Sequence, residues 1–371
     1  MKIGMLTFHS QLNYGGVLQC WALKTALEKL GHEVVVVDRW WNKDNRRLRG
    51  DFWVLSHRRR LGYLRYALRA ANGEFGTFIR RLRTMLFIRH RLNLTSYGFH
   101  DWKDAPRELG VDAIVVGSDQ VWRIGSWDDP APYLLEFRDD VRKFSYAASF
   151  GMSELPEDSL ARYKVALEKF AAVSCREHEG VAICKRMGIN ATQVADPTLL
   201  IDIPDYGVRV GRDKNVLVCY FLSQDPIPVL PILEDFALRN SCEVVLLTIE
   251  DRRISKKGLR KVTFAASAGP KEFLRYLAMA RWVVTDSFHG LMFSAIFNRN
   301  VRILRPADPI RLAMFARIDE FVRACVQGNA VCQNVSSALQ SLERDPRIEY
   351  RRDSIEEMRR DSLRWIAENV K

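Results

Sequence analysis

The 371-residue sequence has no run of 18 or more apolar residues, so it predicts no membrane-spanning helix. Its start, MKIGMLTFHS, lacks the long apolar stretch of a signal peptide, which favours a cytoplasmic protein. It also lacks any CxxC pair, and its seven cysteines are an odd number. A disulfide framework or a zinc site therefore has little support, and we expect buried, reduced thiols and no metal.

The sequence does contain enough apolar residues, 47% of the total, for a packed core. At roughly 150 residues per domain, its length predicts two domains. The formal net charge of +12 favours anionic partners, a class that includes phosphorylated small molecules, anionic lipids and nucleic acid. The charge alone does not choose among these three.

Strand-like and helix-like segments alternate from the N-terminus. Residues 2–8 predict a short buried strand, residues 17–30 a helix that ends before a glycine, and residues 33–38 a second strand. A strand, a helix and a strand in this order form a βαβ unit with two parallel strands. The first loop holds glycines but no GxGxxG, so it gives little support to a dinucleotide site.

The alternation continues along the chain. Further strands are predicted at 112–116, 143–151, 171–175, 216–222, 243–249, 282–286 and 301–304, and further helices at 157–170, 228–239, 270–280, from 290, and 350–370. A polar stretch with proline and glycine at 201–215 predicts a domain boundary. We therefore expect one Rossmann-like domain over residues 1–205, a second over 206–345, and a C-terminal helix over 346–371.

Residues 46–91 differ from the rest of the chain. They contain thirteen arginines but only two acidic residues, Asp51 and Glu74, and aromatic residues and leucines are interleaved with the arginines. This composition predicts a pair of basic helices inserted into the first domain rather than part of its sheet.

Two consecutive parallel α/β units predict an α/β protein in which two Rossmann-like domains face a cleft. Ligands bind to such sheets beyond the carboxyl ends of the strands. Five places in the sequence put polar residues there. They are Asn13–Gly16, Gly117–Gln120, Ser149–Gly151, Arg176 and Asp286–Gly290.

The two strongest candidates are a histidine and an arginine. His289 follows a strand and precedes a helix that begins at Gly290, where backbone N–H groups are placed to hold an anion while the imidazole transfers a proton. The alternative is a histidine that only caps or packs under the helix. Arg176 suits bidentate binding of phosphate or carboxylate, and the alternative is an exposed salt bridge to Glu177 or Glu179.

The remaining candidates for substrate binding are polar or glycine residues in the same loops. They are Asn13, Tyr14, Gly15, Ser118, Asp119, Gln120, Asp286, Ser287 and Gly290. The first loop either lets backbone approach a ligand closely or forms a simple turn. Asp119 is suited to act as a base or to bind sugar hydroxyls, and the alternative is a helix N-cap, as it is for Asp286. Arg305 and Arg311 follow the last predicted strand, and either is placed to face the cleft.

Several segments in one order resemble the polysaccharide pyruvyltransferase family. They are KIGMLTFHSQLNYGGVLQCWALKTALEKLGHEVVVVD, the pair DAIVVGSDQVW and SYAASFG, SCREHEG with ADPTLL, and VTDSFHGLMFSAIF. Each segment alone is modestly specific, whereas all of them together, over residues 2–297, are a strong signal. The basic insert at 46–91 and the chain beyond 312 lie outside the resemblance.

The resemblance implies a fold similar to GT-B glycosyltransferases, with the site between the domains. It implies an enzyme that transfers a pyruvyl group from phosphoenolpyruvate, a co-substrate rather than a cofactor, to a sugar as a ketal in cell-surface or exopolysaccharide biosynthesis. The family's second-domain histidine and the arginine of its RE or RD motif, implicated in donor binding and catalysis, correspond to His289 and Arg176. A further basic residue stands about twenty positions after the histidine, and Arg311 is the nearest candidate.

Two other functions remain open from the sequence. The first is a glycosyltransferase that uses a nucleotide sugar on the same architecture. The second is an arginine-rich binder of membrane or nucleic acid, although no nucleic-acid motif is present. For the pyruvyltransferase, the expected partners are phosphoenolpyruvate and a nucleotide- or lipid-linked saccharide, with contact to an anionic membrane through the basic insert at the inner face.

Overall fold

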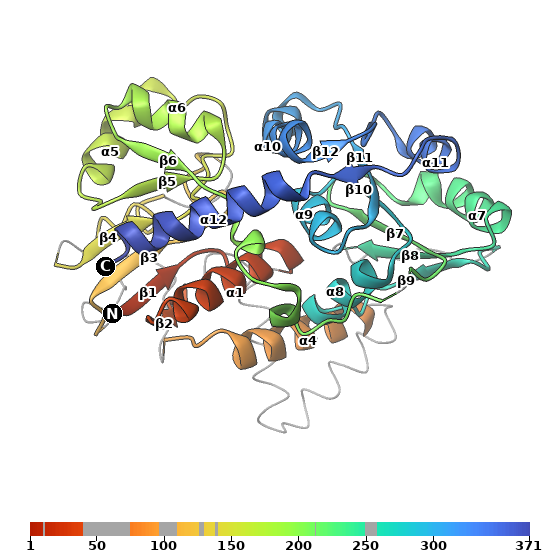
Figure 1. Ribbon diagram of the computed structural model, residues 1–371, viewed down its shortest axis with the longest axis horizontal. Coiled ribbons are helices and arrows are strands. Elements are labelled where there is room, and N and C mark those ends of the chain that lie inside the picture. Colours follow the sequence, from red (N-terminus) through yellow and green to blue (C-terminus); the bar gives the residue numbers. More distant parts are fainter. Residues whose placement is uncertain are drawn as a thin grey trace.

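The computed structural model describes residues 1–9, 12–39, 75–95, 110–125, 130–137, 140–211, 213–248 and 258–371. Figure 1 shows two α/β domains side by side, with a long C-terminal helix that lies across both. Each domain is built on parallel strands with helices packed against them. The two Rossmann-like domains expected from the sequence are therefore present.

The first domain contains a four-stranded sheet in the order β2-β1-β3-β4, and every neighbouring pair is parallel. Its strands are β1 (Lys2–Leu6), β2 (Glu33–Val36), β3 (Ala113–Val116) and β4 (Arg142–Ser145). Single bridges continue this sheet to a parallel pair of short strands, β5 (Val173–Cys175) and β6 (Ala191–Gln193). The helices are α1 (Tyr14–Lys29), α4 (Phe75–Arg91), α5 (Glu157–Leu167) and α6 (His178–Arg186).

The second domain contains a six-stranded parallel sheet in the order β13-β11-β10-β7-β8-β9. Its strands are β7 (Val216–Phe221), β8 (Glu243–Thr248), β9 (Val262–Phe264), β10 (Trp282–Thr285), β11 (Asn300–Leu304) and β13 (Val331–Cys332). Its helices are α7 (Leu230–Arg239), α8 (Pro270–Met279), α9 (Phe288–Ile296), α10 (Pro309–Cys325) and α11 (Val335–Arg344). A small antiparallel pair, β12 (Val326–Gln327) with β14 (Glu349–Tyr350), precedes the last helix.

The central strands of both sheets are buried along their whole length. All four residues of β3, all six of β7 and all four of β10 are buried. Such continuous apolar runs are typical of parallel strands that helices cover on both faces, and the β-branched residues in them fit the pleated surface. Polar residues begin directly after these strands, so the chain places its chemistry at the carboxyl edges of the two sheets.

The last helix, α12 (Arg352–Asn369), begins beside the second domain and packs on the first. The Ser362 hydroxyl accepts a hydrogen bond of 2.8 Å from the backbone N–H of Ala195, and Arg359 forms an ion pair of 2.7 Å with Asp202. The C-terminal helix expected from the sequence is therefore an inter-domain strap.

The basic insert is described only in part. The helix α4 occupies its last third, whereas residues 46–74 lie outside the described residues, so the prediction of two helices is examined only at α4. The α4 helix carries five arginines and no acidic residue. It contacts the second domain, where Arg83 donates a hydrogen bond of 2.8 Å to the Ser267 carbonyl, and an added Cβ at Gly76 would lie 2.7 Å from Ala266.

All seven cysteines are buried and none forms a disulfide, as the sequence predicts. Two of them approach each other behind the first domain's sheet, with the Sγ atoms of Cys175 and Cys184 3.8 Å apart. Within the described ranges, no helix combines the length and the apolar character that crossing a membrane requires.

Candidate active site between the two domains

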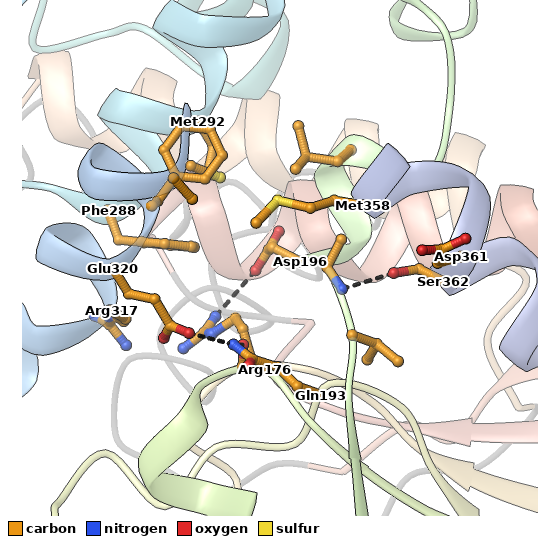
Figure 2. Close-up of a pocket in the computed structure, with 15 residues that line it drawn as sticks. Arg176, Gln193, Asp196, Phe288, Met292, Arg317, Glu320, Met358, Asp361 and Ser362 are labelled. Atoms are coloured by element: carbon orange, nitrogen blue, oxygen red, sulfur yellow. Dashed lines mark hydrogen bonds and ion pairs between the residues drawn. The ribbon is translucent and has the colours of Figure 1, made fainter. Parts of the chain in front are cut away.

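A cavity of about 270 Å³ lies where the two domains and α12 meet. Figure 2 shows its lining, which comes from the end of β6, from α9 and α10, and from α12. The polar lining residues are Arg176, Gln193, Asp196, Arg317, Glu320, Asp361 and Ser362. Apolar side chains, among them Phe288, Met292, Phe321 and Met358, form the other walls. A polar floor with apolar walls is typical of sites for small ligands.

Asp196 contacts several of the polar side chains around this cavity, and it is the N-cap of the short 3-10 helix η2 (Pro197–Leu199). Its Oδ1 accepts hydrogen bonds from the backbone N–H and the hydroxyl of Thr198, at 3.0 and 2.7 Å. Its Oδ2 accepts one from Arg176 at 3.0 Å and lies 3.7 Å from His289 Nε2. Burial alone would raise the pKa of Asp196, but His289, Arg176 and the Thr198 hydrogen bonds together hold it below the ordinary value of 3.8.

Arg176 is almost completely buried and is surrounded by carboxylates. Its guanidinium lies 3.0 Å from Asp196, 3.4 Å from Glu177 and 3.9 Å from Asp119. Burial lowers its pKa, yet these three carboxylates together raise it above the ordinary value, so the group stays charged. Its Nη2 has no hydrogen-bond partner among the described residues, which leaves one N–H group for a ligand.

His289 is the second residue of α9 and is buried. The hydroxyl of the preceding Ser287 caps this helix by accepting a hydrogen bond of 3.3 Å from the Gly290 N–H. Burial lowers the pKa of His289 below 6.5, against the opposite effect of Asp196 and Asp119, so the imidazole is neutral at pH 7. In the described part of the chain nothing hydrogen-bonds to its Nε2, which is therefore available for proton transfer.

Residues Asn13–Gly16, predicted as a loop, are instead the N-cap and first turn of α1, and Gly15 packs against His289 of the opposite domain. A Cβ added to Gly15 would lie only 2.0 Å from His289 Nδ1, so the imidazole occupies the space that a side chain would need. Asn13 caps α1, because its Oδ1 accepts a hydrogen bond of 3.0 Å from the Gly15 N–H. Tyr14 is buried in the second domain, where it stacks on Phe273 and donates a hydrogen bond of 2.8 Å to the Ala268 carbonyl. The start of α1 therefore contacts the second domain and packs against His289.

Arg317, on α10, lines this cavity and is one of the residues that the sequence did not indicate. Its Nε and Nη1 are buried and have no hydrogen-bond partner among the described residues. The guanidinium lies 5.2 Å from the centre of the Phe288 ring, and that of Arg176 lies 4.9 Å from the same ring. Burial, with the neighbouring charge of Arg176, lowers the pKa of Arg317 to about 10. A buried guanidinium without a counter-ion is suited to receive an anion.

Three side chains near the domain boundary therefore have buried nitrogens without a hydrogen-bond partner among the described residues: Arg317 at Nε and Nη1, Arg176 at Nη2 and His289 at Nε2. Buried polar groups are nearly always hydrogen-bonded, and leaving one unpaired costs about 1–3 kcal/mol. An anionic ligand that accepts from both arginines would satisfy them. The arrangement can hold an anion and exchange a proton beside it.

The predicted residues of the DSFHG motif have separate roles. Asp286 does not face the cavity: its carboxylate accepts hydrogen bonds of 2.6, 2.7 and 2.9 Å from the backbone N–H groups of Leu222, Ser223 and Gln224. It fixes the loop after β7. Gly290 is required by packing, because an added Cβ would lie 2.4 Å from Thr285 Oγ1. Of this motif, Phe288 lines the cavity, and His289, which is not a lining residue, lies 3.7 Å from Asp196 in the lining.

The GSDQ segment after β3 lies at the edge of the site. Ser118 is buried, and its hydroxyl donates a hydrogen bond of 3.4 Å to Asp196. Asp119 has a positive φ of 77° and contributes to the carboxylate shell of Arg176, so it is not a helix N-cap. The Gln120 amide lies against Gly151, where an added Cβ would be 2.9 Å from Nε2. This Nε2 has no hydrogen-bond partner in the described residues.

The structure places Arg311, the predicted second arginine, outside this cavity. Arg311 lies in the first turn of α10, is exposed and does not line the cavity, and its backbone N–H is bound to Asp308. Arg305 does not line the cavity either: it forms an ion pair of 2.6 Å with Asp319, and its guanidinium stacks over the Phe315 ring. The residue that faces Arg176 is Arg317, about two turns further along α10. Asp196 also went unrecognised, because the short strand β6 (Ala191–Gln193) that precedes it was not predicted from the sequence.

Comparisons with known proteins agree with this architecture. A family model described as polysaccharide pyruvyl transferase matches residues 13–308. No curated protein sequence matches the chain. A UDP-GlcNAc 2-epimerase from Methanocaldococcus jannaschii aligns with a TM-score of 0.58 at 11% identity, over 99% of both chains. The UDP-GlcNAc 2-epimerase from Neisseria meningitidis, bound to UDP-GlcNAc, aligns with a TM-score of 0.52 at 11% identity, over 100% of this chain and 99% of that one. These likenesses confirm the GT-B-like fold expected from the sequence.

Proposed function

Because the chain belongs to the polysaccharide pyruvyl transferase family, we propose that it transfers the pyruvyl group of phosphoenolpyruvate to a sugar in cell-surface or exopolysaccharide biosynthesis. The observation that supports this most is the unpaired Arg317 beside Arg176 and His289. Phosphoenolpyruvate carries a phosphate and a carboxylate, and guanidinium groups bind both kinds of anion with two parallel hydrogen bonds.

The reaction needs proton transfer as well as anion binding. Protonation of the methylene carbon makes the neighbouring carbon electrophilic, and one sugar hydroxyl attacks it and loses its proton. The phosphate then leaves with the bonding electrons and takes up a proton, and a second hydroxyl closes the ketal and loses its own proton. Fixed positive charge at the departing phosphate stabilises the transition state.

In this proposal, the neutral His289 accepts the proton of the attacking hydroxyl at Nε2. The Asp196 carboxylate, 3.7 Å from that atom, stabilises the imidazolium that forms. Arg317 and the free Nη2 of Arg176 hold the donor anion. Asp119, 3.9 Å from that Nη2, and Glu177, 3.4 Å from Nε, keep the Arg176 guanidinium in place.

The acceptor is expected to be a nucleotide- or lipid-linked saccharide. A lipid-linked acceptor would bring the enzyme to the inner face of a membrane, where α4 is suited to anionic lipid because it exposes three of its five arginines, Arg83, Arg89 and Arg91, together with Phe75 and Leu86. Flotation with vesicles tests this contact. Binding to anionic vesicles at low salt and not to neutral ones is expected, and equal binding to both would refute it.

The direct test of the function is phosphate release from phosphoenolpyruvate in the presence of a panel of nucleotide- and lipid-linked sugars. Donor binding alone should raise stability by about 2.7 kcal/mol at 100 times the dissociation constant, which a thermal melt detects. The second candidate is a glycosyltransferase that uses a nucleotide sugar, favoured by the likeness to an epimerase bound to UDP-GlcNAc. A stability increase with UDP-sugars and none with phosphoenolpyruvate would decide for this candidate.

A further inference from the structure

Arg317 and Glu320 are three positions apart on α10, so their side chains leave the helix on the same face. Oppositely charged residues at this spacing normally attract each other. No ion pair joins them here, and within the described residues Arg317 has no acidic side chain at ion-pair distance, although several carboxylates lie further away. The unpaired state of Arg317 therefore needs a reason.

The reason is that Glu320 binds to the other domain. Figure 2 shows its side chain reaching from α10 toward Gln193. Its Oε1 accepts a hydrogen bond of 2.6 Å from the Gln193 amide, at the end of β6. Its Oε2 accepts one of 3.4 Å from the backbone N–H of His178, the first residue of α6. The start of a helix carries partial positive charge, which favours a carboxylate there.

We infer that Glu320 is a positioning residue that controls the availability of Arg317 for the donor anion, an inference that rests on the proposed function. While the domains touch, Gln193 and the N-terminus of α6 hold the Glu320 carboxylate, and Arg317 keeps its full charge for a phosphate or carboxylate. When this contact is lost, the Glu320 carboxylate returns to Arg317 and neutralises it. Anion binding in the second domain is thereby coupled to contact with the first.

The coupling is tested most sharply by removing the partner of Glu320 rather than Glu320 itself. The substitution Gln193→Ala releases Oε1, so the carboxylate becomes free to pair with Arg317. We expect the dissociation constants of inorganic phosphate and of phosphoenolpyruvate, measured by calorimetry, to rise about fivefold, the effect typical of one ion pair near a surface. The KM for phosphoenolpyruvate should rise similarly, with kcat nearly unchanged.

The second variant, Gln193→Ala with Glu320→Ala, should restore anion affinity to near the wild-type value, because no carboxylate remains to compete for Arg317. In an Arg317→Ala background, Gln193→Ala should have no further effect. Gln340→Ala is the matched control, since it removes an exposed glutamine of α11 that does not line this cavity. Its affinity should equal that of the wild type.

Two results would overturn the inference. If Gln193→Ala leaves phosphate affinity unchanged or increases it, Glu320 does not compete for Arg317. If the double variant remains as weak as Gln193→Ala, the loss does not pass through Glu320 but through Gln193 itself, whose amide also donates a hydrogen bond of 3.3 Å to the Arg176 carbonyl. The proposed function fails separately: the coupling can be present in phosphate binding while no sugar in the panel accepts a pyruvyl group. That outcome would leave an anion-binding enzyme with a different reaction.

Discussion

The contact between Gly15 and His289 predicts that adding a single methyl group, in the substitution Gly15→Ala, has a large effect. In Gly15→Ala the new Cβ would lie 2.0 Å from Nδ1, 2.3 Å from Cγ and 2.7 Å from Cε1 of the imidazole. Ordinary contact begins near 3.4 Å, so the ring and the start of α1 must separate by about 1.4 Å. Overpacking of this kind typically costs about 1–3 kcal/mol of stability.

The same displacement should affect catalysis more than it affects folding. A reacting group misplaced by about 1 Å can lose about 10²-fold in rate. We therefore expect Gly15→Ala to lower kcat by about that factor and the melting temperature by a few degrees. Gly4→Ala is the matched control, because its Cβ would meet side chains at ordinary distances of 3.5 and 3.6 Å. It should leave both quantities nearly unchanged.

A double-mutant cycle in calorimetry isolates the contact. In a His289→Ala background the ring is absent, so the added methyl group meets no clash. Alanine is also favoured over glycine within a helix by about 0.5–1 kcal/mol. Gly15→Ala should therefore lower the melting temperature of the wild type and raise that of His289→Ala. An equal loss in both backgrounds would refute the argument, since it would show that the methyl group collides with something other than the imidazole.

The remaining predictions concern the charged groups of the cavity. His289→Gln should reduce turnover about 10²- to 10⁴-fold in a folded enzyme. Because the pKa of His289 is lowered below 6.5, wild-type activity should fall only as the pH drops below that value. A loss of activity centred above pH 6.5 would contradict this assignment. Arg176→Ala should cost about 3–5 kcal/mol in a thermal or denaturant melt, because it leaves buried carboxylates without their shared cation, and a melt like that of the wild type would count against the network. Arg317→Ala should weaken phosphoenolpyruvate binding about tenfold in calorimetry with little loss of stability, because no ion pair is broken. Arg311→Ala should change neither, and weakened binding there would restore Arg311 as the second arginine.

The sheets and the carboxyl-edge residues were predictable because their cause is local. Valine-rich runs such as β7 and β10 form buried parallel strands, and a polar residue just after such a strand must lie at the sheet edge. This reasoning brings Arg176, His289 and Asp119 near one another without knowledge of the structure. It does not show which of them keep an unpaired polar atom, because that depends on partners from distant parts of the chain.

The helix α10 shows why the second arginine could not be predicted. Its apolar pattern is interrupted by arginines, and the family match ends at residue 308, just before the helix begins. Arg311 and Arg317 stand on the same helix, and only the packing of α10 against the first domain decides which of them faces inward. Asp286 shows the opposite error, since a carboxylate at a sheet edge is occupied by three backbone N–H groups and the Ser223 hydroxyl.

The strap formed by α12 has a consequence for the order in which the protein is made. Ser362 lies 167 residues after Ala195, whose backbone N–H donates a hydrogen bond to the Ser362 hydroxyl. At a ribosomal rate of about 5–20 residues per second, the first domain waits about 10–30 s for this helix. During that interval Trp365 does not yet cover Tyr146. The apolar surface around Tyr146 is then exposed to water, to chaperones or to other nascent chains. Chains that stall before α12 should therefore aggregate or be degraded even though their first domain is fully translated.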